Sequence, residues 1–200
     1  SSKDATVTGT QRATNPAGID DMMSYQMSLK SLELRRDMEN ILLGNTGQNA
    51  GNTTTARTLR SFNSWISANG SRGTNGADST GATYASTDGT AGDLRTFTEA
   101  MLKDAIKDAF DDGGEPNIVL VGSFNKQKFS TFTGRATARE NVQVGTVQGA
   151  AELYASDFGQ LKVVPNRFQR SRDVLIFQMD MWAMGTLPGR NMVSTPLAKT

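Results

Sequence analysis

The longest regular pattern of apolar and polar positions runs from residue 17 to residue 43. Between Asn15-Pro16 and Gly44 the chain contains no proline, and no glycine after Gly18. Asparagine is a preferred helix N-cap, proline is tolerated at the first helical position, and glycine accepts the left-handed conformation after the last turn. The pattern therefore predicts one helix over 17–43, about 40 Å long at 1.5 Å per residue.

This predicted helix carries two apolar stripes on different sides. With successive residues 100° apart, polar seams separate the two stripes. We consider two interpretations: the helix lies between two layers of its own domain, or it packs the first stripe on its own domain and offers the second to another subunit. The second interpretation makes Met22, Tyr25, Leu29 and Leu32 candidate subunit-interface residues. The first stripe contains Ile19, Met23, Met27, Leu34, Met38, Ile41 and Leu42, and the second adds Leu43 to those four candidates.

Helical and strand patterns alternate in the second half of the chain. Thr96-x-x-Glu99 has the spacing of a capping box and predicts the start of a helix that ends before Gly113. The continuous apolar run at 117–122 is typical of a buried strand, and Ser123 predicts the cap of a short helix through about residue 132. We therefore expect helix, central strand and helix to form an α/β layer. Further strands are predicted at 152–156, 161–165 and 173–178, with a fourth candidate at 182–187.

Two other segments have weaker patterns. Residues 3–11 alternate β-branched and polar side chains, which favours a strand or hairpin arm. Residues 67–93 are almost wholly Gly, Ser, Thr, Asn, Asp and Ala, with too little apolar surface to offset the entropy of ordering. We expect a long exposed loop there, and we expect the fold to tolerate its deletion between Gly73 and Gly92.

The composition restricts the chemistry. Lysine and arginine number 21 against 20 aspartates and glutamates, so the net charge of +1 excludes the strongly basic body of a protein whose main task is to grip nucleic acid. The chain has no cysteine and no histidine, which excludes disulfides, Ser-His-Asp triads and nearly every transition-metal site within one chain. No apolar run approaches the roughly 20 residues that a membrane span needs. We expect a soluble protein without catalytic residues, cofactor or metal.

One candidate ligand site lies at the junction of the buried strand and the short helix. Gly122 and Ser123 place backbone N–H groups at a helix N-terminus, where a phosphate could sit with Lys126 or Arg167. No P-loop, dinucleotide or nucleophile-elbow motif supports this site. Ordinary helix capping is therefore the favoured interpretation.

A second candidate site is a turn rich in arginine. Arg167, Arg170 and Arg172 surround it, with Lys162 nearby. The planar guanidinium group suits both phosphate and the carboxylates of a neighbouring subunit, so these three arginines are further candidate interface residues. An acidic group could bind Ca²⁺ but lacks the alternating loop that such sites use, and we expect a solvated helix end. That group comprises Asp108, Asp111, Asp112 and Glu115.

Four stretches resemble the major capsid (major head) proteins of tailed bacteriophages. The resemblance implies an α+β fold of the Hong Kong 97 type, with a long spine helix, a peripheral domain and an α/β axial domain. It implies that copies pack into hexamers and pentamers, which close into an icosahedral shell around packaged double-stranded DNA. The stretches are LELRRDMENILLGN at 32–45, RTFTEAMLKDAIKDAF at 95–110, GSFNKQKFSTFTG at 122–134 and YASDFGQLKVVPNRFQRSRDVLIF at 154–177.

The same resemblance implies partners, a location and a domain plan. Scaffolding, portal and decoration proteins are implied as further partners, with assembly in the host cytoplasm and residence in the virion. Family members usually carry an N-terminal arm before the position of Ser1 and more peripheral-domain sequence after Thr200, so we expect a trimmed or processed form, or its ordered part. The plan is 1–14 as the returning arm of an extended loop, 15–66 as the peripheral domain with the spine helix at 17–43, 67–93 as a flexible loop, 94–187 as the axial domain, and 188–200 as the return to the peripheral domain.

Three other functions stay open at this point. A bacterial nanocompartment shell would use the same fold and enclose cargo in place of DNA. A small α/β phosphate-binding domain or enzyme would use the Gly122-Ser123 helix start, and would bind phosphate or nucleotide as a monomer. An adhesin or surface module would require the 67–93 segment to be ordered and rich in strands.

Overall fold

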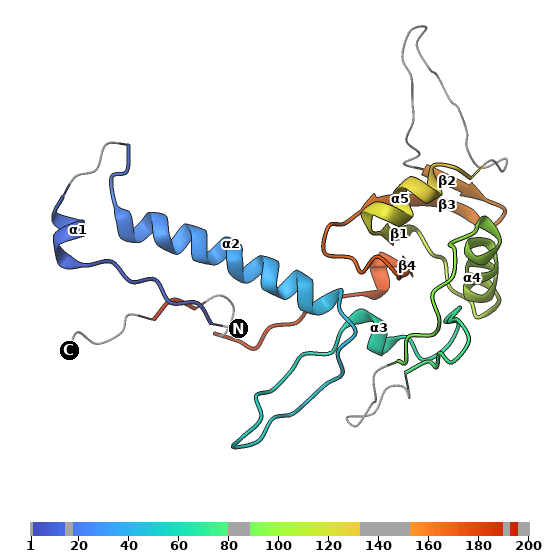
Figure 1. Ribbon diagram of the computed structural model, residues 1–200, viewed down its shortest axis with the longest axis horizontal. Coiled ribbons are helices and arrows are strands. Elements are labelled where there is room, and N and C mark those ends of the chain that lie inside the picture. The colour runs from blue at the N-terminus through green and yellow to red at the C-terminus, as the bar shows by residue number, and fades with distance from the viewer. Residues whose placement is uncertain (1, 15–17, 80–88, 133–152, 190–192, 196–200) are drawn as a thin grey trace, which may run out of the picture. The chain divides into compact units, whose positions relative to one another are not determined.

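The computed structural model describes residues 2–14, 18–79, 89–132, 153–189 and 193–195 (Figure 1). Contacts divide the chain into two compact units. Unit 1 comprises Ser1–Glu39 and Ala183–Thr200, and unit 2 comprises Asn40–Trp182. We describe each unit separately.

Unit 1 begins with an extended segment and a short helix, where the sequence predicted a strand. Helix α1 spans Gly9–Ala13, and the hydroxyl of Thr8 accepts a hydrogen bond from the Gln11 backbone N–H at 3.3 Å. The strand expected at 3–11 is therefore wrong. Thr8 acts as an N-cap, because its short polar side chain satisfies a backbone donor that a strand would have offered to a neighbour.

Helix α2 spans Met22–Leu42 and begins later than the sequence predicted. The Asp21 carboxylate accepts hydrogen bonds from the backbone N–H groups of Met23 and Ser24, at 3.1 and 3.2 Å, so Asp21 is the cap. A carboxylate also interacts favourably with the positive end of the helix dipole. Gly18 has a φ of +87°, and the expected cap at Asn15 and Pro16 lies outside the described residues. The helix is thus about 32 Å long.

No residue of α2 is buried against the described part of the chain. Met27, from the stripe expected in the core, is 43% exposed. The interpretation in which α2 lies between two layers of its own domain is therefore wrong for the described residues. Leu43, which follows the helix, is buried in unit 2. Gly44 ends the helix without the positive φ that the sequence predicted.

Unit 2 is built on a mixed four-stranded sheet. The strands β1 and β3 are parallel, whereas β1 pairs antiparallel with β4 and β2 pairs antiparallel with β3. The four predicted strand positions are confirmed to within two residues, but the candidate strand at 182–187 is wrong, because the chain turns through the short 3₁₀ helix Met179–Met181 after β4. The sheet order is β2-β3-β1-β4, with β1 at Ile118–Val121, β2 at Leu153–Ser156, β3 at Gly159–Pro165 and β4 at Val174–Phe177.

Helices α4 (Glu99–Asp111) and α5 (Ser123–Phe129) pack on one face of this sheet (Figure 1). Both helices were predicted, but both caps differ. Thr98 caps α4 by accepting a hydrogen bond from the Met101 N–H at 3.4 Å, in place of Thr96, and Gly122 precedes α5 in place of Ser123. The buried core on this face contains Leu102, Ile106, Val119, Val121, Phe129, Tyr154, Leu161 and Val163.

The opposite face of the sheet supports a smaller aromatic core. Phe62, in the one-turn helix α3 (Phe62–Trp65), packs its ring 5.0 Å from Phe177 and 4.9 Å from Trp182. Leu43 and Leu175 complete this cluster. Residues 43–66 are thereby anchored to the sheet of unit 2.

The segment 67–93 is held by specific contacts in its described parts, residues 67–79 and 89–93. Arg72 forms an ion pair with Asp78 at 2.5 Å, and Ala77 forms a β-bridge with Thr90. The Asn45 side chain donates a hydrogen bond to the Gly89 carbonyl at 2.8 Å. The described parts of the segment are largely an exposed loop without helix or strand, as expected, but these contacts hold it in place. The contacts that hold this segment are hydrogen bonds and an ion pair between polar groups, because the segment buries little apolar surface.

These contacts reverse the expectation that the segment can be deleted without cost. A Cβ atom at Gly92 would lie closer than van der Waals contact to the Gly73 carbonyl oxygen. We expect Gly92→Ala to lower the free energy of unfolding by about 1–3 kcal/mol, measured by urea denaturation. Gly185→Ala is the control, because no atom lies within 4 Å of a Cβ there. Equal free energies of unfolding for both variants would mean that the backbones of Gly73 and Gly92 are not closely packed in solution.

Candidate functional site

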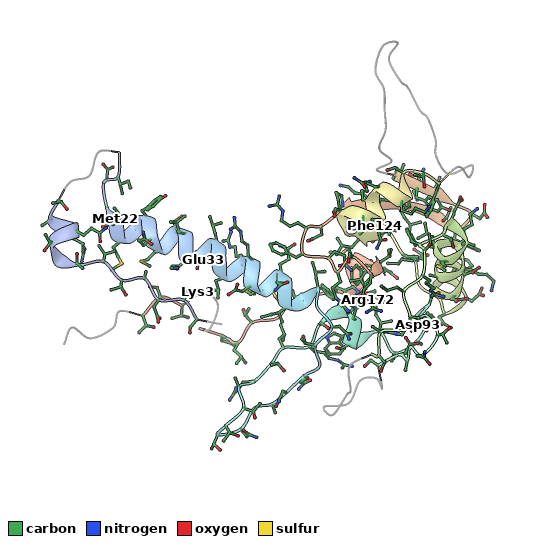
Figure 2. The ribbon with its side chains drawn as sticks, in the orientation of Figure 1. Lys3, Met22, Glu33, Asp93, Phe124 and Arg172 are labelled. Atoms are coloured by element: carbon green, nitrogen blue, oxygen red, sulfur yellow. The ribbon has the colours of Figure 1, made fainter. Side chains whose placement is uncertain are left out.

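The first candidate surface is the exposed apolar face of α2 in unit 1. Tyr25, Leu29 and Leu32 are 47%, 37% and 46% exposed, and Met22 is half-buried. These residues recur at helical spacings of three and four, so they share one side of the helix. Met22 lies near the start of α2 in Figure 2. Exposed apolar side chains grouped on one side of a helix make this face a candidate interaction site.

One polar seam of α2 is covered by the protein's own N-terminal segment. The Lys3 ammonium group lies 2.8 Å from the Asp37 carboxylate and 4.0 Å from that of Glu33, which Lys30 also contacts at 3.1 Å (Figure 2). The hydrogen bond to Asp37 raises the pKa of Lys3. This seam is therefore paired within the chain, whereas the apolar face with Tyr25, Leu29 and Leu32 is among the exposed sides of α2.

The three candidate arginines of the turn in unit 2, Arg167, Arg170 and Arg172, differ in their contacts. Arg170 forms an ion pair with Asp173 at 3.0 Å, and Arg172 donates a hydrogen bond to the Gly92 carbonyl. Both side chains hold the turn against its own unit. Arg167 is exposed, and no described residue forms an ion pair with it. Of the three, Arg167 is the one for which no hydrogen bond or ion pair with a described residue is seen, so it is the most accessible to another molecule.

The helix start at Gly122 is closed by the chain itself. A Cβ at Gly122 would lie 3.2 Å from the Gln169 carbonyl oxygen, and the Asn125 side chain donates a hydrogen bond to the Ser171 carbonyl at 2.9 Å. Backbone from the arginine turn therefore occupies the space around this N-terminus. The geometry does not favour the phosphate site that Gly122 and Ser123 suggested.

A half-open cleft of about 970 Å³, which the sequence did not reveal, lies in unit 2. Asp93, Phe124 and Arg172 line it, from the 89–97 segment, α5 and the arginine turn respectively (Figure 2). Its lining comes from segments far apart in the chain, which is why no local motif signalled it.

The acidic residues around the end of α4 do not form a metal centre in the described part of the chain. No group of three possible metal ligands occurs there. Asp111 pairs with Lys107 at 3.2 Å, and Asp112 accepts a hydrogen bond from the Asn69 side chain at 2.7 Å. Among the described residues, none of the helices is long and apolar enough to cross a membrane.

One buried titratable group links α4 to the sheet. The Tyr154 hydroxyl donates a hydrogen bond to the Glu99 carboxylate at 3.3 Å. Burial, with the nearby Glu99 charge, raises the pKa of Tyr154 to about 12. The folded protein therefore retains this phenol proton at a pH where the unfolded chain, with an ordinary pKa of about 10, loses it.

We expect this difference to reduce stability in alkali. The contribution of Tyr154 is fully present below about pH 10 and is lost as the pH rises to about 12, by at most about 3 kcal/mol at 1.4 kcal/mol per pKa unit. In Tyr154→Phe the free energy of unfolding should fall less over this range than in the wild type. Urea denaturation at a series of pH values measures it. Tyr25→Phe is the control because Tyr25 is exposed, and identical curves for all three proteins would contradict the prediction.

The model of the family described as SU10 major capsid protein matches residues 1–200, the whole of the chain. No curated protein matches it.

Proposed function

The chain belongs to the SU10 major capsid protein family and is therefore a structural capsid subunit of a phage, and we propose that it builds the icosahedral head of a tailed, double-stranded DNA phage. Membership of this family implies self-assembly into a capsid and a location in the virion. The match over residues 1–200 is the observation that carries the proposal. Host-cytoplasm assembly is part of the proposal.

The proposal includes a Hong Kong 97-type fold with α2 as its spine helix. An uninterrupted helix of 21 residues and a four-stranded sheet flanked by two helices support it. The domain plan stays as proposed: a returning arm at 1–14, a peripheral domain at 15–66, a loop at 67–93, an axial domain at 94–187 and a peripheral return at 188–200. Parts of these segments, including 15–17, 80–88 and 196–200, lie outside the described residues.

Within such a shell, we assign the contacts between copies to two surfaces. The exposed apolar face of α2, with Met22, Tyr25, Leu29 and Leu32, supplies apolar burial. The arginine turn supplies charge, with Arg167 as the side chain directed to a neighbour and with Arg170 and Arg172 fixing the turn. Heterologous contacts of modest area, repeated around hexamers and pentamers, add up to a closed particle.

We propose that the shell encloses double-stranded DNA without binding specific base sequences. The net charge of +1 supports weak contact between the subunit and DNA. The affinity of a protein for DNA rises with the number of phosphates that its lysines and arginines neutralise. Scaffolding, portal and decoration proteins are the other proposed partners. A capsid family is not an enzyme family, and the proposed role needs no cofactor.

The alternative functions have less support. A nanocompartment shell would share the fold, but the matching family is one of major capsid proteins. The phosphate-binding domain loses its site, because backbone atoms of residues 169–171 fill the space around Gly122.

Negative-stain microscopy of the purified protein tests the proposal. Closed shells or capsomer rings of the expressed chain are the expected result, and nuclease-protected double-stranded DNA in particles from infected cells distinguishes a phage head from a nanocompartment. A protein that stays monomeric at high concentration and binds phosphate would overturn it.

A further inference from the structure

Charge is segregated within unit 2, although the chain as a whole is close to neutral. Residues 99–115 contain six acidic and two basic side chains, whereas residues 162–172 contain four basic and no acidic ones. The two segments thus carry net charges of −4 and +4. Two copies can satisfy these charges by placing one segment against the other in a head-to-tail contact.

The acidic segment borders a shallow hollow of about 540 Å³ between α4 and residues 69–78. Asp104 and Asp108 line it, one helical turn apart, so both carboxylates lie on the same side of α4. Both are exposed, and no described residue forms an ion pair with either. The third carboxylate of the hollow, Asp78, is already paired with Arg72. Lys107, which also lines the hollow, attracts both carboxylates, but its ion pair is with Asp111, so the two carboxylates still lack a directly bound cation.

The hollow suits a guanidinium group better than a metal ion. The described residues offer no group of three metal ligands, and Lys107 at the rim pairs with Asp111. A guanidinium group presents five N–H donors in a planar fork, so it can bind the carboxylates of Asp104 and Asp108 together. In the arginine turn, Arg167 and Arg172 are both exposed and form no ion pair with a described residue, but Arg172 is held by its hydrogen bond to the Gly92 carbonyl, which leaves Arg167 as the freer guanidinium group.

We propose that Arg167 of one copy inserts into the acidic hollow of a neighbouring copy and contacts Asp104 and Asp108. This inference rests on the proposed function, because it takes a second copy of the chain as the occupant. The rigid support of both sides favours the contact: Arg170 and Arg172 hold the turn in place, and Asp104 and Asp108 project from a helix packed on the main core. The contact would set the order of copies around a ring.

A charge exchange tests the pairing. We expect Arg167→Glu and Asp108→Arg each to reduce the yield of assembled particles by at least about tenfold, the effect of losing a modest contact. Combining them in one chain should restore assembly, because the pair is re-formed with opposite sign. Arg57→Glu, at an exposed position outside both segments where no ion pair with a described residue is seen, is the control and should assemble normally. Circular dichroism melting of the unassembled proteins checks folding, which should not change because all three side chains are exposed.

Cross-linking gives an independent measure of proximity. Because the chain has no cysteine, Arg167→Cys and Asp108→Cys each introduce a single thiol. In particles that contain both variants, a short bis-maleimide should join unlike copies, whereas Arg57→Cys with Arg167→Cys, with the first thiol outside the hollow, should give at least about tenfold less product. Cross-linking also checks the pairing if a charge reversal disturbs folding.

The possible results separate this inference from the proposed function. Failure of the wild-type protein to assemble would overturn both. Normal assembly of Arg167→Glu and Asp108→Arg, or loss of assembly that the combined variant does not restore together with no preferential cross-link, would overturn the pairing and leave the capsid function in place. Higher salt should weaken the wild-type contact, since exposed charges are screened.

Discussion

Replacing Phe129 with alanine is expected to lower the free energy of unfolding of unit 2 by about 3–5 kcal/mol. The Phe129 side chain is 1% exposed, and its ring lies 5.3 Å from that of Phe132 and 5.6 Å from that of Tyr154. It joins α5 to the sheet at the centre of the main core. Truncation removes apolar burial and leaves a cavity that neighbouring side chains fill only in part.

The same helix provides the control for this variant. Phe124 is also in α5 but is 65% exposed, so Phe124→Ala should change the free energy of unfolding by less than about 0.5 kcal/mol. Urea denaturation followed by fluorescence of Trp65 and Trp182, both in unit 2, measures the effect. Similar losses in the two variants would show that burial in this core does not account for the stability of the sheet.

Replacing Leu29 with aspartate is expected to abolish assembly while the subunit stays folded. If the exposed face of α2 packs on another copy, burying the part of Leu29 that is exposed, 37% of the residue, contributes about 0.5–1 kcal/mol to each contact. A carboxylate at that position must also be desolvated without a partner, which costs more. Because every contact in the shell is affected, the assembled fraction should fall far more than the tenfold that about 1.4 kcal/mol represents.

Ser28→Asp is the matched control, because it adds the same charge at the adjacent exposed position without removing an apolar side chain. It should assemble like the wild type. Sedimentation and negative-stain microscopy measure assembly, and circular dichroism measures helix content. Loss of helical signal in Leu29→Asp would show that this face stabilises the subunit itself, and normal particles would remove the α2 face from the interface.

Elements with a strong local pattern could be predicted from the sequence. The apolar run at 117–122 and the amphipathic stripe of 99–111 emerged as β1 and α4, because each pattern suits one secondary structure and one buried side. The caps were less predictable. Two possible capping threonines stand close together before α4, and the position of the first turn against the core selects Thr98 over Thr96.

The sequence pattern did not predict which polar segments are buried and held in place. The composition of 67–93 indicated solvent exposure, yet Ser79 and Gly89 in this segment are buried. Before the segment, the charged side chain of Arg60 is also buried, with its guanidinium carbon 4.3 Å from the centre of the Trp65 ring. Hydrophobicity patterns do not report such segments, because hydrogen bonds to distant residues hold them. The same reason applies to the candidate arginines, whose sequence neighbours do not show which of them are paired.

By itself, the sequence determined the order and type of the main elements of unit 2 and the absence of histidine and cysteine chemistry. These properties depend on residue type and on spacing within a few turns. Only the tertiary structure decided that α2 leaves its apolar face open, that the Gly122 helix start is filled, and that Arg167 is exposed while Arg170 and Arg172 are engaged. Burial and pairing depend on residues far apart in the chain, and local spacing carries no information about them.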